Sequence, residues 1–259
     1  PRERDLSYRI WKKKEKLFRN SQVSVITPSS WLHTCVHASS LLHQQEVHTI
    51  FNPIDSGLFK PADRDVACHN LGLDPSKKYI LFGAATMKNV LKGFNYFLEA
   101  IQIISREPEV VGDVEILLFG KATGDVVQSF PLNTRNIAFV QSTQTMADLY
   151  RVAHLFVIPS LQDNLPNTII ESMFCGTPVV GFRTGGIPEM IDHKVNGYLA
   201  DHQSSPDLAK GMSWILTSDS YERLSAETRD LAVKRFSMDD SVERHMDLYR
   251  SLINKEQQT

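Results

Sequence analysis

The chain has 259 residues, 42% of them hydrophobic and 22% charged, which is enough to bury the core of one large or two small domains. Its net charge of -2 argues against a general nucleic-acid-binding protein. Cys35, Cys68 and Cys175 are scattered without a C-x-x-C motif, which argues against a disulfide framework or a zinc knuckle and fits a reducing, cytoplasmic location.

The first twenty residues are basic, with eight Lys and Arg against three acidic residues. Leu6, Ile10, Leu17 and Phe18 recur at helical spacing and predict an amphipathic helix. Such a helix can make peripheral contact with an anionic membrane, but we favour the alternative of an ordinary helix with a solvated lysine face. No apolar run approaches the length of a membrane span, and no signal peptide opens the chain. Because the chain begins at Pro1 without an initiator Met, we expect a fragment or a processed chain.

A short strand is predicted at Val23–Ile26, then a helix with Ser30 as its N-cap, and a second strand at Val47–Phe51. His33 and His37 lie four residues apart on that helix, which is a spacing found in zinc sites. The zinc-protease pattern needs Glu beside the first His, and the sequence has Thr34 there. We therefore favour a polar helix face and expect no metal.

The rest of the chain alternates short apolar strands with helices, and this pattern predicts an α/β fold with a Rossmann-like, doubly wound parallel sheet. Strands are predicted at Tyr79–Gly83, Val114–Phe119, Ile137–Val140, Leu155–Ile158 and Val179–Phe182. Helices are predicted at Phe94–Ser105, Met146–Ala153, Pro166–Cys175, Pro206–Thr217, Tyr221–Phe236 and Met238–Ile253. Asn196-Gly197 predicts a hairpin-type turn.

The stretch from Pro159 to Phe182 combines a strand end, a polar loop with Asp163 and a helix with Glu171. Both carboxylates can face one crevice at the carboxyl end of the strand, next to the free N–H groups of the helix start. Carboxylates accept hydrogen bonds from hydroxyls and amides hold phosphate, so the stretch suits a phosphorylated sugar. The alternative is that Asp163 only complements the helix dipole and Glu171 lies on a solvated face.

This stretch, D-x7-E followed by C-G-T-P-V-V, resembles the E-x7-E motif of the retaining GT-B glycosyltransferases of family 4 (glycosyl transferases group 1). The resemblance extends from about Ser24 to Leu252. Asn52-Pro53-Ile54-Asp55 is similar to the N-G-[IV]-D turn at the domain crossing of this family, and residues 185–189 are similar to its G-G-x-x-E loop. The resemblance implies the donor-binding half of a GT-B fold at residues 53–237, a remnant of the acceptor domain at 1–52, and a crossing helix at 238–259.

The same resemblance implies roles for individual residues. Glu171 would bind the ribose hydroxyls of a nucleotide sugar, Asp163 a hydroxyl of the transferred sugar, and Lys92 the diphosphate. The remaining donor-binding candidates are residues at the helix start and at two strand ends, namely Asn164, Leu165, Asn167, Thr168, Gly83 and Gly120.

Three positions depart from the family pattern. Asp163 is one methylene shorter than the usual Glu, and Pro166 has no N–H to offer to a phosphate. Ala84 occupies the position of a second cation, an Arg, for which Lys88 is the nearest substitute. Without the resemblance, Lys92 reads as an ordinary surface lysine.

The function expected from the resemblance is transfer of a hexose from a nucleotide diphosphate sugar to a carbohydrate or lipid-linked acceptor, with retained configuration, in polysaccharide or glycoconjugate synthesis. We expect no metal or other cofactor, since the family that the chain resembles needs none. We expect this chain to bind the donor without transferring the sugar by itself. The alternatives are a catalytically idle relative that binds a nucleotide or a partner, which Ala84 favours, and a nucleotide-sugar epimerase, whose motifs are not those found here.

Overall fold

The computed structural model describes residues 5–86, 89–137 and 140–256, and it divides the chain into two compact units. Unit 1 comprises the residues up to Asn52 and those from Ser241 onward, and unit 2 runs from Pro53 to Asp240. The first division falls at the residue where the sequence analysis places a domain boundary. The second falls inside the last helix, three residues after the expected start of the crossing helix.

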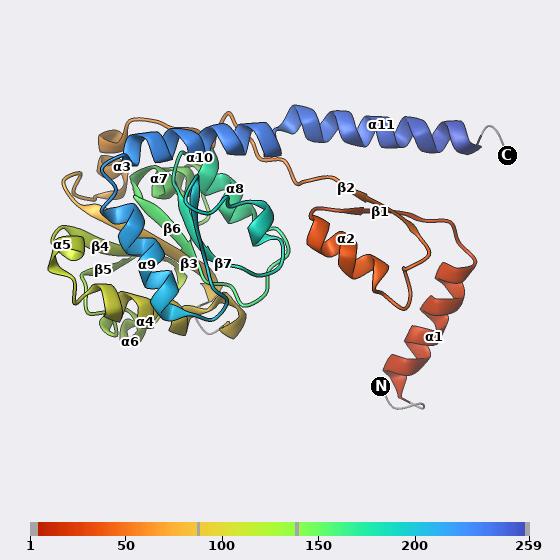
Figure 1. Cartoon of the computed structure of the whole chain (residues 1–259), viewed down its shortest axis with the longest axis horizontal. Coiled ribbons are helices and arrows are strands. Elements are labelled where there is room, and N and C mark those ends of the chain that lie inside the picture. Colours follow the sequence, from red (N-terminus) through yellow and green to blue (C-terminus); the bar gives the residue numbers. More distant parts are fainter. Residues whose placement is uncertain (1–4, 87–88, 138–139, 257–259) are drawn as a thin grey trace. The chain divides into compact units, whose positions relative to one another are not determined.

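Unit 2 contains a six-stranded sheet in the order β5-β4-β3-β6-β7-β8, in which every neighbouring pair is parallel (Figure 1). Its strands are β3 (Lys78–Thr86), β4 (Val114–Lys121), β5 (Thr134–Asn136), β6 (Leu155–Ile158), β7 (Val179–Phe182) and β8 (Gly197–Ala200). The central strands β6 and β7 are buried along their whole length, as expected for a parallel sheet covered on both faces. The predicted fold class is confirmed.

Alternate residues of β3 point to opposite sides of the sheet, so the sheet has two apolar faces. Helices cover both of them. Ile80 and Phe82 belong to the core cluster formed with α4 and α9, while α3, α7, α8 and α10 lie on the other face (Figure 1). The helices of unit 2 are α3 (Arg64–Leu71), α4 (Phe94–Ile104), α5 (Pro108–Val111), α6 (Gly124–Gln128), α7 (Thr143–Val152), α8 (Asn167–Phe174), α9 (Ser205–Leu216) and α10 (Tyr221–Phe236), with 3-10 turns η1 (Val90–Lys92) and η2 (Ile187–Glu189). The result is a three-layer α/β/α arrangement.

The sequence predicts β6, β7 and α10 with the same bounds as the structure, and it is wrong about the third strand of the sheet. That strand is Thr134–Asn136 instead of Ile137–Val140, of which 138–139 lie outside the described residues. β5 is a short edge strand of polar residues paired only with β4, so it has no apolar run to mark it.

The hairpin predicted at Asn196-Gly197 is also wrong, because Gly197 begins β8, which runs parallel to β7. Asn196 is fully buried and closes a local turn instead: its amide donates to the Met190 carbonyl, and its side-chain oxygen accepts from the Asp192 N–H. A parallel neighbour cannot be reached by a two-residue hairpin, so the turn residues here serve a different connection.

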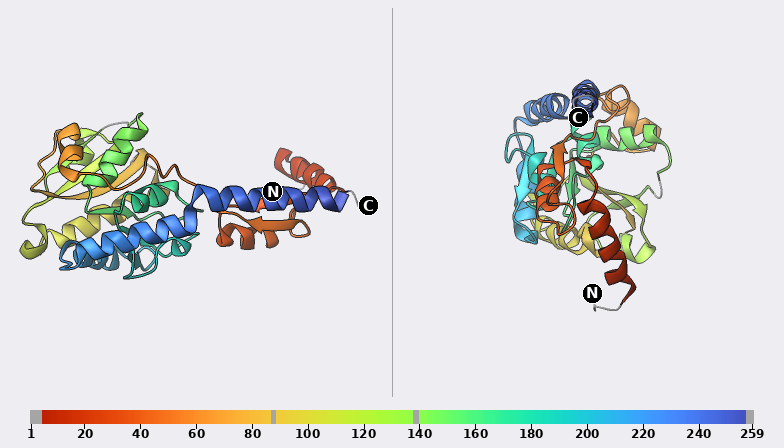
Figure 2. Two further views of the ribbon diagram at one scale, coloured as in Figure 1. Left: turned by 90° about the horizontal axis from the view of Figure 1, so that it is seen from above. Right: turned by 90° about the vertical axis from the view of Figure 1, so that its right-hand side faces the viewer.

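Unit 1 contains α1 (Leu6–Arg19), the strands β1 (Ser24–Thr27) and β2 (Glu46–Thr49), α2 (Ser30–His37) and most of α11 (Met238–Glu256), which is one continuous helix (Figure 2). The two strands pair in parallel. Ser29, instead of the predicted Ser30, caps α2 by accepting from the Leu32 N–H. The amphipathic helix predicted near the N-terminus is present as α1. No helix in the described ranges is both long and apolar enough to cross a membrane.

Candidate functional site

The candidate site lies where β3 and β6 run side by side in the middle of the sheet. β4 and β5, the next two strands in sequence, lie on one side of β3, and β6 lies on the other, so the strand order reverses at this point. In parallel sheets such a reversal leaves a crevice beyond the carboxyl ends of the two strands. The loops that leave β3 and β6 therefore border the same space.

Backbone contacts hold these two loops together. The Leu161 N–H donates to the Leu91 carbonyl at 2.8 Å. Gly93 has a φ of 69°, and a Cβ built on it would lie 1.8 Å from the Pro159 carbonyl oxygen. Only glycine fits there, since any side chain would push η1 away from the loop after β6.

This contact brings Lys92 and Asp163 together. Their Nζ and Oδ2 atoms are 2.7 Å apart, and the two side chains are 35% and 17% exposed. The hydroxyl of the fully buried Ser160 donates to the same Oδ2 at 3.3 Å. Within the described ranges no donor reaches the other carboxylate oxygen, Oδ1, of Asp163. The carboxylate is thus fixed through one oxygen, and the other is available to a ligand hydroxyl.

The two glycines after β7 hold the backbone of Asp163. A Cβ on Gly185, whose φ is 55°, would lie 1.7 Å from the Asp163 carbonyl oxygen, and the Gly186 N–H donates to that oxygen at 3.2 Å. Both glycines therefore lie close against the backbone of the protein's own chain.

The N-terminus of α8 faces the loop that contains Asp163. Its N-cap is Pro166, no side chain caps it with a hydrogen bond, and its first turn contains no acidic residue. The helix dipole is thus not offset by a carboxylate in that turn, a condition that favours an anionic ligand. Of the predicted amide donors, Leu165 is buried, Thr168 is partly buried and Asn167 is exposed as the first residue of α8, while Asn164 lies partly buried in the preceding loop.

Glu171 lies in the second turn of α8 and is partly buried. The phenol of Tyr150 on α7 donates to Glu171 Oε2 at 2.8 Å. Burial raises the pKa of the Glu171 carboxyl above its ordinary value, and the Tyr150 hydrogen bond opposes that shift. Burial, and then the charge of Glu171, raise the pKa of Tyr150 well above its ordinary value, so the phenol remains a donor.

Gly83 lies inside β3, three residues before its end, and Gly120 is the second-last residue of β4; both have neighbours that exclude a side chain. A Cβ on Gly83 would meet the Phe119 ring at 2.1 Å, and one on Gly120 would lie 1.8 Å from the Ala84 carbonyl oxygen. Packing within the sheet explains both glycines, and their role in donor binding stays a prediction. Ala84 is buried in the core, and Lys88, its suggested substitute, lies outside the described residues.

Comparison with known proteins identifies the family. The family model of glycosyl transferases group 1 matches residues 77–218, more than half of the chain, and this range includes Lys92, Asp163 and Glu171. The chain belongs to the glycosyl transferases group 1.

Relatives with assigned names are longer than this glycosyltransferase chain. A D-inositol 3-phosphate glycosyltransferase of Segniliparus rotundus is 29% identical over 61% of this chain and 36% of its own length. D-inositol 3-phosphate glycosyltransferase 1 of Catenulispora acidiphila is 28% identical over 81% of this chain and 52% of its own length. The chain thus spans about a third to a half of these two relatives.

Solved structures share the fold at low identity. Sucrose-phosphate synthase from Thermosynechococcus elongatus has a TM-score of 0.77 at 20% identity, covering 98% of this chain and 64% of that chain. Anabaena Alr3699/HepE, solved in complex with UDP and glucose, has a TM-score of 0.74 at 19% identity, covering 93% of this chain and 66% of that chain.

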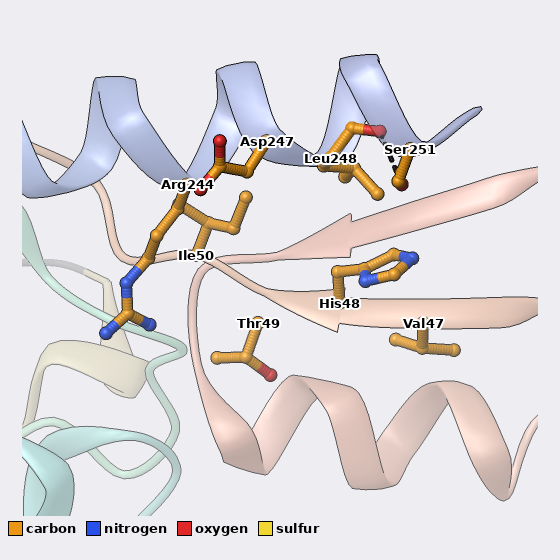
Figure 3. Close-up of a pocket in the computed structure, with 8 residues that line it drawn as sticks. All are labelled: Val47, His48, Thr49, Ile50, Arg244, Asp247, Leu248 and Ser251. Atoms are coloured by element: carbon orange, nitrogen blue, oxygen red, sulfur yellow. Dashed lines mark hydrogen bonds between the residues drawn. The ribbon is translucent and has the colours of Figure 1, made fainter. Parts of the chain in front are cut away.

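Unit 1 has two features of its own, whereas the glycosyltransferase site residues all belong to unit 2. An open groove of about 540 Å³ lies between β2 and α11 and is lined by residues such as Ile50 and Leu248, but by none of the predicted site residues (Figure 3). His33 and His37 contact each other through their Nε2 atoms at 3.0 Å. The described parts of the chain contain no group of three or more metal-ligand side chains.

The sequence analysis did not identify Ser160 or Tyr150 as part of the site. Ser160 is the second residue after the buried strand β6, and a polar residue at that position was an available signal. Tyr150 lies on the buried face of a helix, 21 residues before Glu171, and its position in the sequence pattern is typical of a core residue. The contact of its hydroxyl with Glu171 could therefore be found only from the structure.

Proposed function

We propose that unit 2 binds a nucleotide diphosphate sugar at the β3–β6 crevice and that the whole enzyme transfers the sugar to an acceptor hydroxyl with retained configuration. Family membership supports glycosyl transfer. The observation that supports the donor site best is the 2.7 Å contact between Lys92 Nζ and Asp163 Oδ2. It joins a cation suited to a diphosphate and a carboxylate suited to a sugar hydroxyl in one place.

The ion pair is compatible with both proposed roles. A lysine ammonium has three N–H donors, so Lys92 can keep its contact with Asp163 and still donate to two phosphate oxygens. Asp163 keeps Oδ1 for a hydroxyl of the transferred sugar. Together with the uncapped N-terminus of α8, Lys92 would stabilise the charge that develops on the leaving diphosphate, which is usually the largest catalytic contribution in such a site.

Glu171 is proposed to accept hydrogen bonds from the ribose hydroxyls. Its Oε2 is held by Tyr150, and no donor within the described ranges reaches Oε1. A partly buried carboxylate with one unpaired oxygen needs a hydroxyl or water as partner, because a charged group left unsatisfied is costly.

The proposal is tested by calorimetric titration with UDP-, GDP- and ADP-glucose, with uridine first because Alr3699/HepE was solved with UDP. Glu171→Ala should weaken binding of the preferred nucleotide by about 1.5–3 kcal/mol, the scale of a hydrogen bond to a charged group. The same variant should lose the preference for a ribonucleotide over its 2′-deoxy counterpart. A folded Glu171→Ala variant that retains both the affinity and the preference would contradict this role, and binding of none of the three donors would overturn the site.

Asp163→Asn tests whether Asp163 contacts the sugar or the nucleotide part of the donor. This variant keeps the side-chain volume but removes the charge, so the free nucleoside diphosphate should bind nearly as before, while the nucleotide sugar binds more weakly and turnover of the complete enzyme falls. Equal losses for the two ligands would place Asp163 on the wrong part of the donor.

The finer statements remain proposals with their own tests. Retention is read from the anomeric configuration of the product by NMR. Glycan or glycoconjugate synthesis is tested with a panel of carbohydrate and lipid-linked acceptors. Peripheral membrane contact through α1 is tested with anionic vesicles.

We propose that no metal takes part in donor binding, so a chelator should leave the donor affinity unchanged. Multiple turnovers by these 259 residues would contradict the prediction that they bind donor without transferring sugar, and would also exclude the idle relative that Ala84 favours.

A further inference from the structure

Tyr150 is fixed in place by its surroundings. It is fully buried, and its ring packs edge-on against Phe156 at a centroid distance of 5.7 Å and lies tilted against Phe59 at 6.2 Å. Its carbonyl oxygen accepts from the buried hydroxyl of Thr177 at 2.6 Å. The phenol therefore has one direction available, and its oxygen lies 2.8 Å from Glu171 Oε2.

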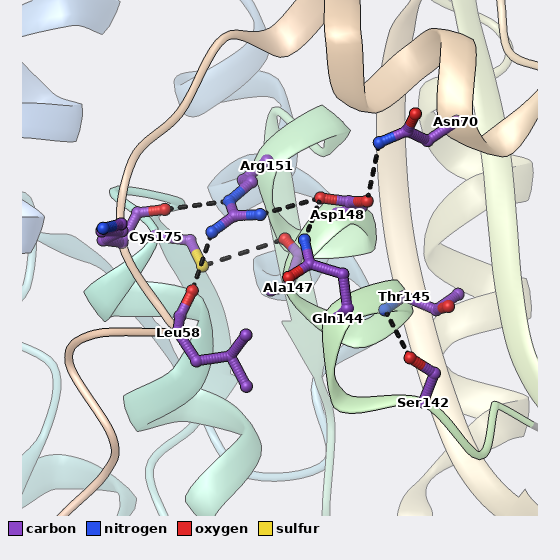
Figure 4. A network of polar contacts seen from close by, with 10 residues as sticks. Leu58, Asn70, Ser142, Gln144, Thr145, Ala147, Asp148, Arg151 and Cys175 are labelled. Atoms are coloured by element: carbon purple, nitrogen blue, oxygen red, sulfur yellow. Dashed lines mark hydrogen bonds and ion pairs between the residues drawn. The ribbon is translucent and has the colours of Figure 1, made fainter.

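The helix α7, which contains Tyr150, is held in place by contacts of two residues that flank Tyr150 in the sequence. Asp148 and Arg151 form an ion pair at 2.8 Å with both side chains only 7% exposed. Arg151 also donates to the carbonyls of Leu58 and Lys60, which fastens α7 to the segment that precedes α3 (Figure 4). These contacts leave α7 little freedom to shift relative to that segment.

We propose that Tyr150 is a positioning residue that orients the Glu171 carboxylate for the donor ribose. This inference rests on the proposed function of Glu171. By occupying Oε2, the phenol turns Oε1 toward the ligand and fixes the carboxylate before the ligand arrives. The hydrogen bond also favours the ionised form of a carboxyl group that burial would otherwise neutralise.

The alternative is that the phenol merely satisfies its own hydrogen-bonding need in the core. The two interpretations differ in how ligand binding depends on pH. The pKa of Glu171 is raised by burial and lowered by the bond from Tyr150, so donor affinity should fall as pH drops through that pKa. Without the phenol hydroxyl the pKa should rise further, and the loss of affinity should begin at a higher pH.

Few other groups bear on Glu171. Cys175, at the end of α8, has its pKa raised to about 12 by burial and is a neutral thiol near neutral pH. Arg151 on α7 and Arg229 on α10 act on Cys175, whose pKa they lower against the larger effect of burial. We call the fall of donor affinity at low pH the acidic limb of binding. A shift of this limb along the pH scale is therefore assigned to titration of Glu171.

The test uses Tyr150→Phe, Glu171→Ala and the double variant, with UDP-glucose as the probe, or the GDP or ADP counterpart if that binds more tightly. These donors have no terminal phosphate group to titrate near neutral pH. Tyr150→Phe should weaken binding about tenfold at neutral pH and move the acidic limb to higher pH. In the Glu171→Ala background the same change should alter affinity by less than about twofold, since the effect passes through Glu171.

Tyr198→Phe is the matched control, because Tyr198 is also mostly buried and its phenol donates to a carboxylate, Asp207 Oδ1, at 3.0 Å. It should leave donor affinity and the acidic limb unchanged. If Glu171→Ala does not affect binding, the proposed role of Glu171 fails. If Glu171→Ala weakens binding but Tyr150→Phe matches the wild type in affinity and pH dependence, only the positioning role is overturned.

If Tyr150→Phe fails to fold, 3-fluorotyrosine at position 150 keeps the hydroxyl and makes it a stronger donor. The acidic limb should then move to lower pH, and an unmoved limb would overturn the inference.

Discussion

Gly185 is the residue on which the position of Asp163 depends most directly. A Cβ there would lie 1.7 Å from the Asp163 carbonyl oxygen, and the φ of 55° already disfavours a side chain. We predict that Gly185→Ala destabilises the protein by about 3 kcal/mol or more, the sum of left-handed strain and a backbone clash. Urea unfolding measures the loss, and calorimetry should show weaker nucleotide-sugar binding because Asp163 is displaced.

Gly72 provides the control at this scale. It has a φ of 63°, but no heavy atom lies within 4 Å of its missing Cβ. Gly72→Ala should therefore cost only about 1 kcal/mol from backbone strain and leave donor affinity unchanged. Equal costs for the two substitutions would mean that the loop at Gly185 yields without moving Asp163.

At the scale of elements, α7 depends on the buried pair of Asp148 and Arg151. Asp148 also accepts hydrogen bonds from Asn70 and Gln144, so the charges of the pair are well satisfied (Figure 4). Arg151→Ala removes the cation of the pair and leaves the Asp148 carboxylate buried without it. We predict a loss of about 3–5 kcal/mol in the free energy of unfolding, measured by urea denaturation.

Arg223→Ala serves for comparison on α10. Arg223 pairs with Glu227 at 2.9 Å, but its side chain is 80% exposed, so solvent screens the pair. Its loss should change stability by less than about 1 kcal/mol. Similar effects for Arg151→Ala and Arg223→Ala would show that the network in Figure 4 does not hold α7 in place.

For the whole molecule, the donor site is predicted to need unit 2 alone. Lys92, Asp163, Glu171 and Tyr150 all lie between Pro53 and Asp240, in the unit that contains the six-stranded sheet and its core. A chain of residues 53–240 should fold cooperatively and bind the nucleotide sugar within about twofold of the full chain. A folded piece that no longer binds would show that unit 1 contributes to the donor site.

Local features of the sequence were enough to predict the class of the fold and to place Asp163 and Glu171 of the site near one another. Buried apolar runs mark β6 and β7 because both faces of a central parallel strand are covered. Gly176 and Pro178, which are typical residues just beyond a helix, mark the end of α8. Asp163 and Glu171 could be placed near one another because a single loop and helix connect them. β5 was missed because a short polar edge strand lacks these signals, and β8, although buried, was missed because Asn196-Gly197 at its start was interpreted as a hairpin turn.

Only the tertiary structure could decide which distant residues meet. Lys92 and Asp163 are 71 residues apart, and their contact exists because β3 pairs with β6 and because Gly93 lies against Pro159. The same holds for Tyr150 and Glu171, whose hydrogen bond depends on the packing of α7 against α8. Periodicity and capping act over a few residues along the chain, whereas strand order and close packing join segments that the sequence pattern leaves independent.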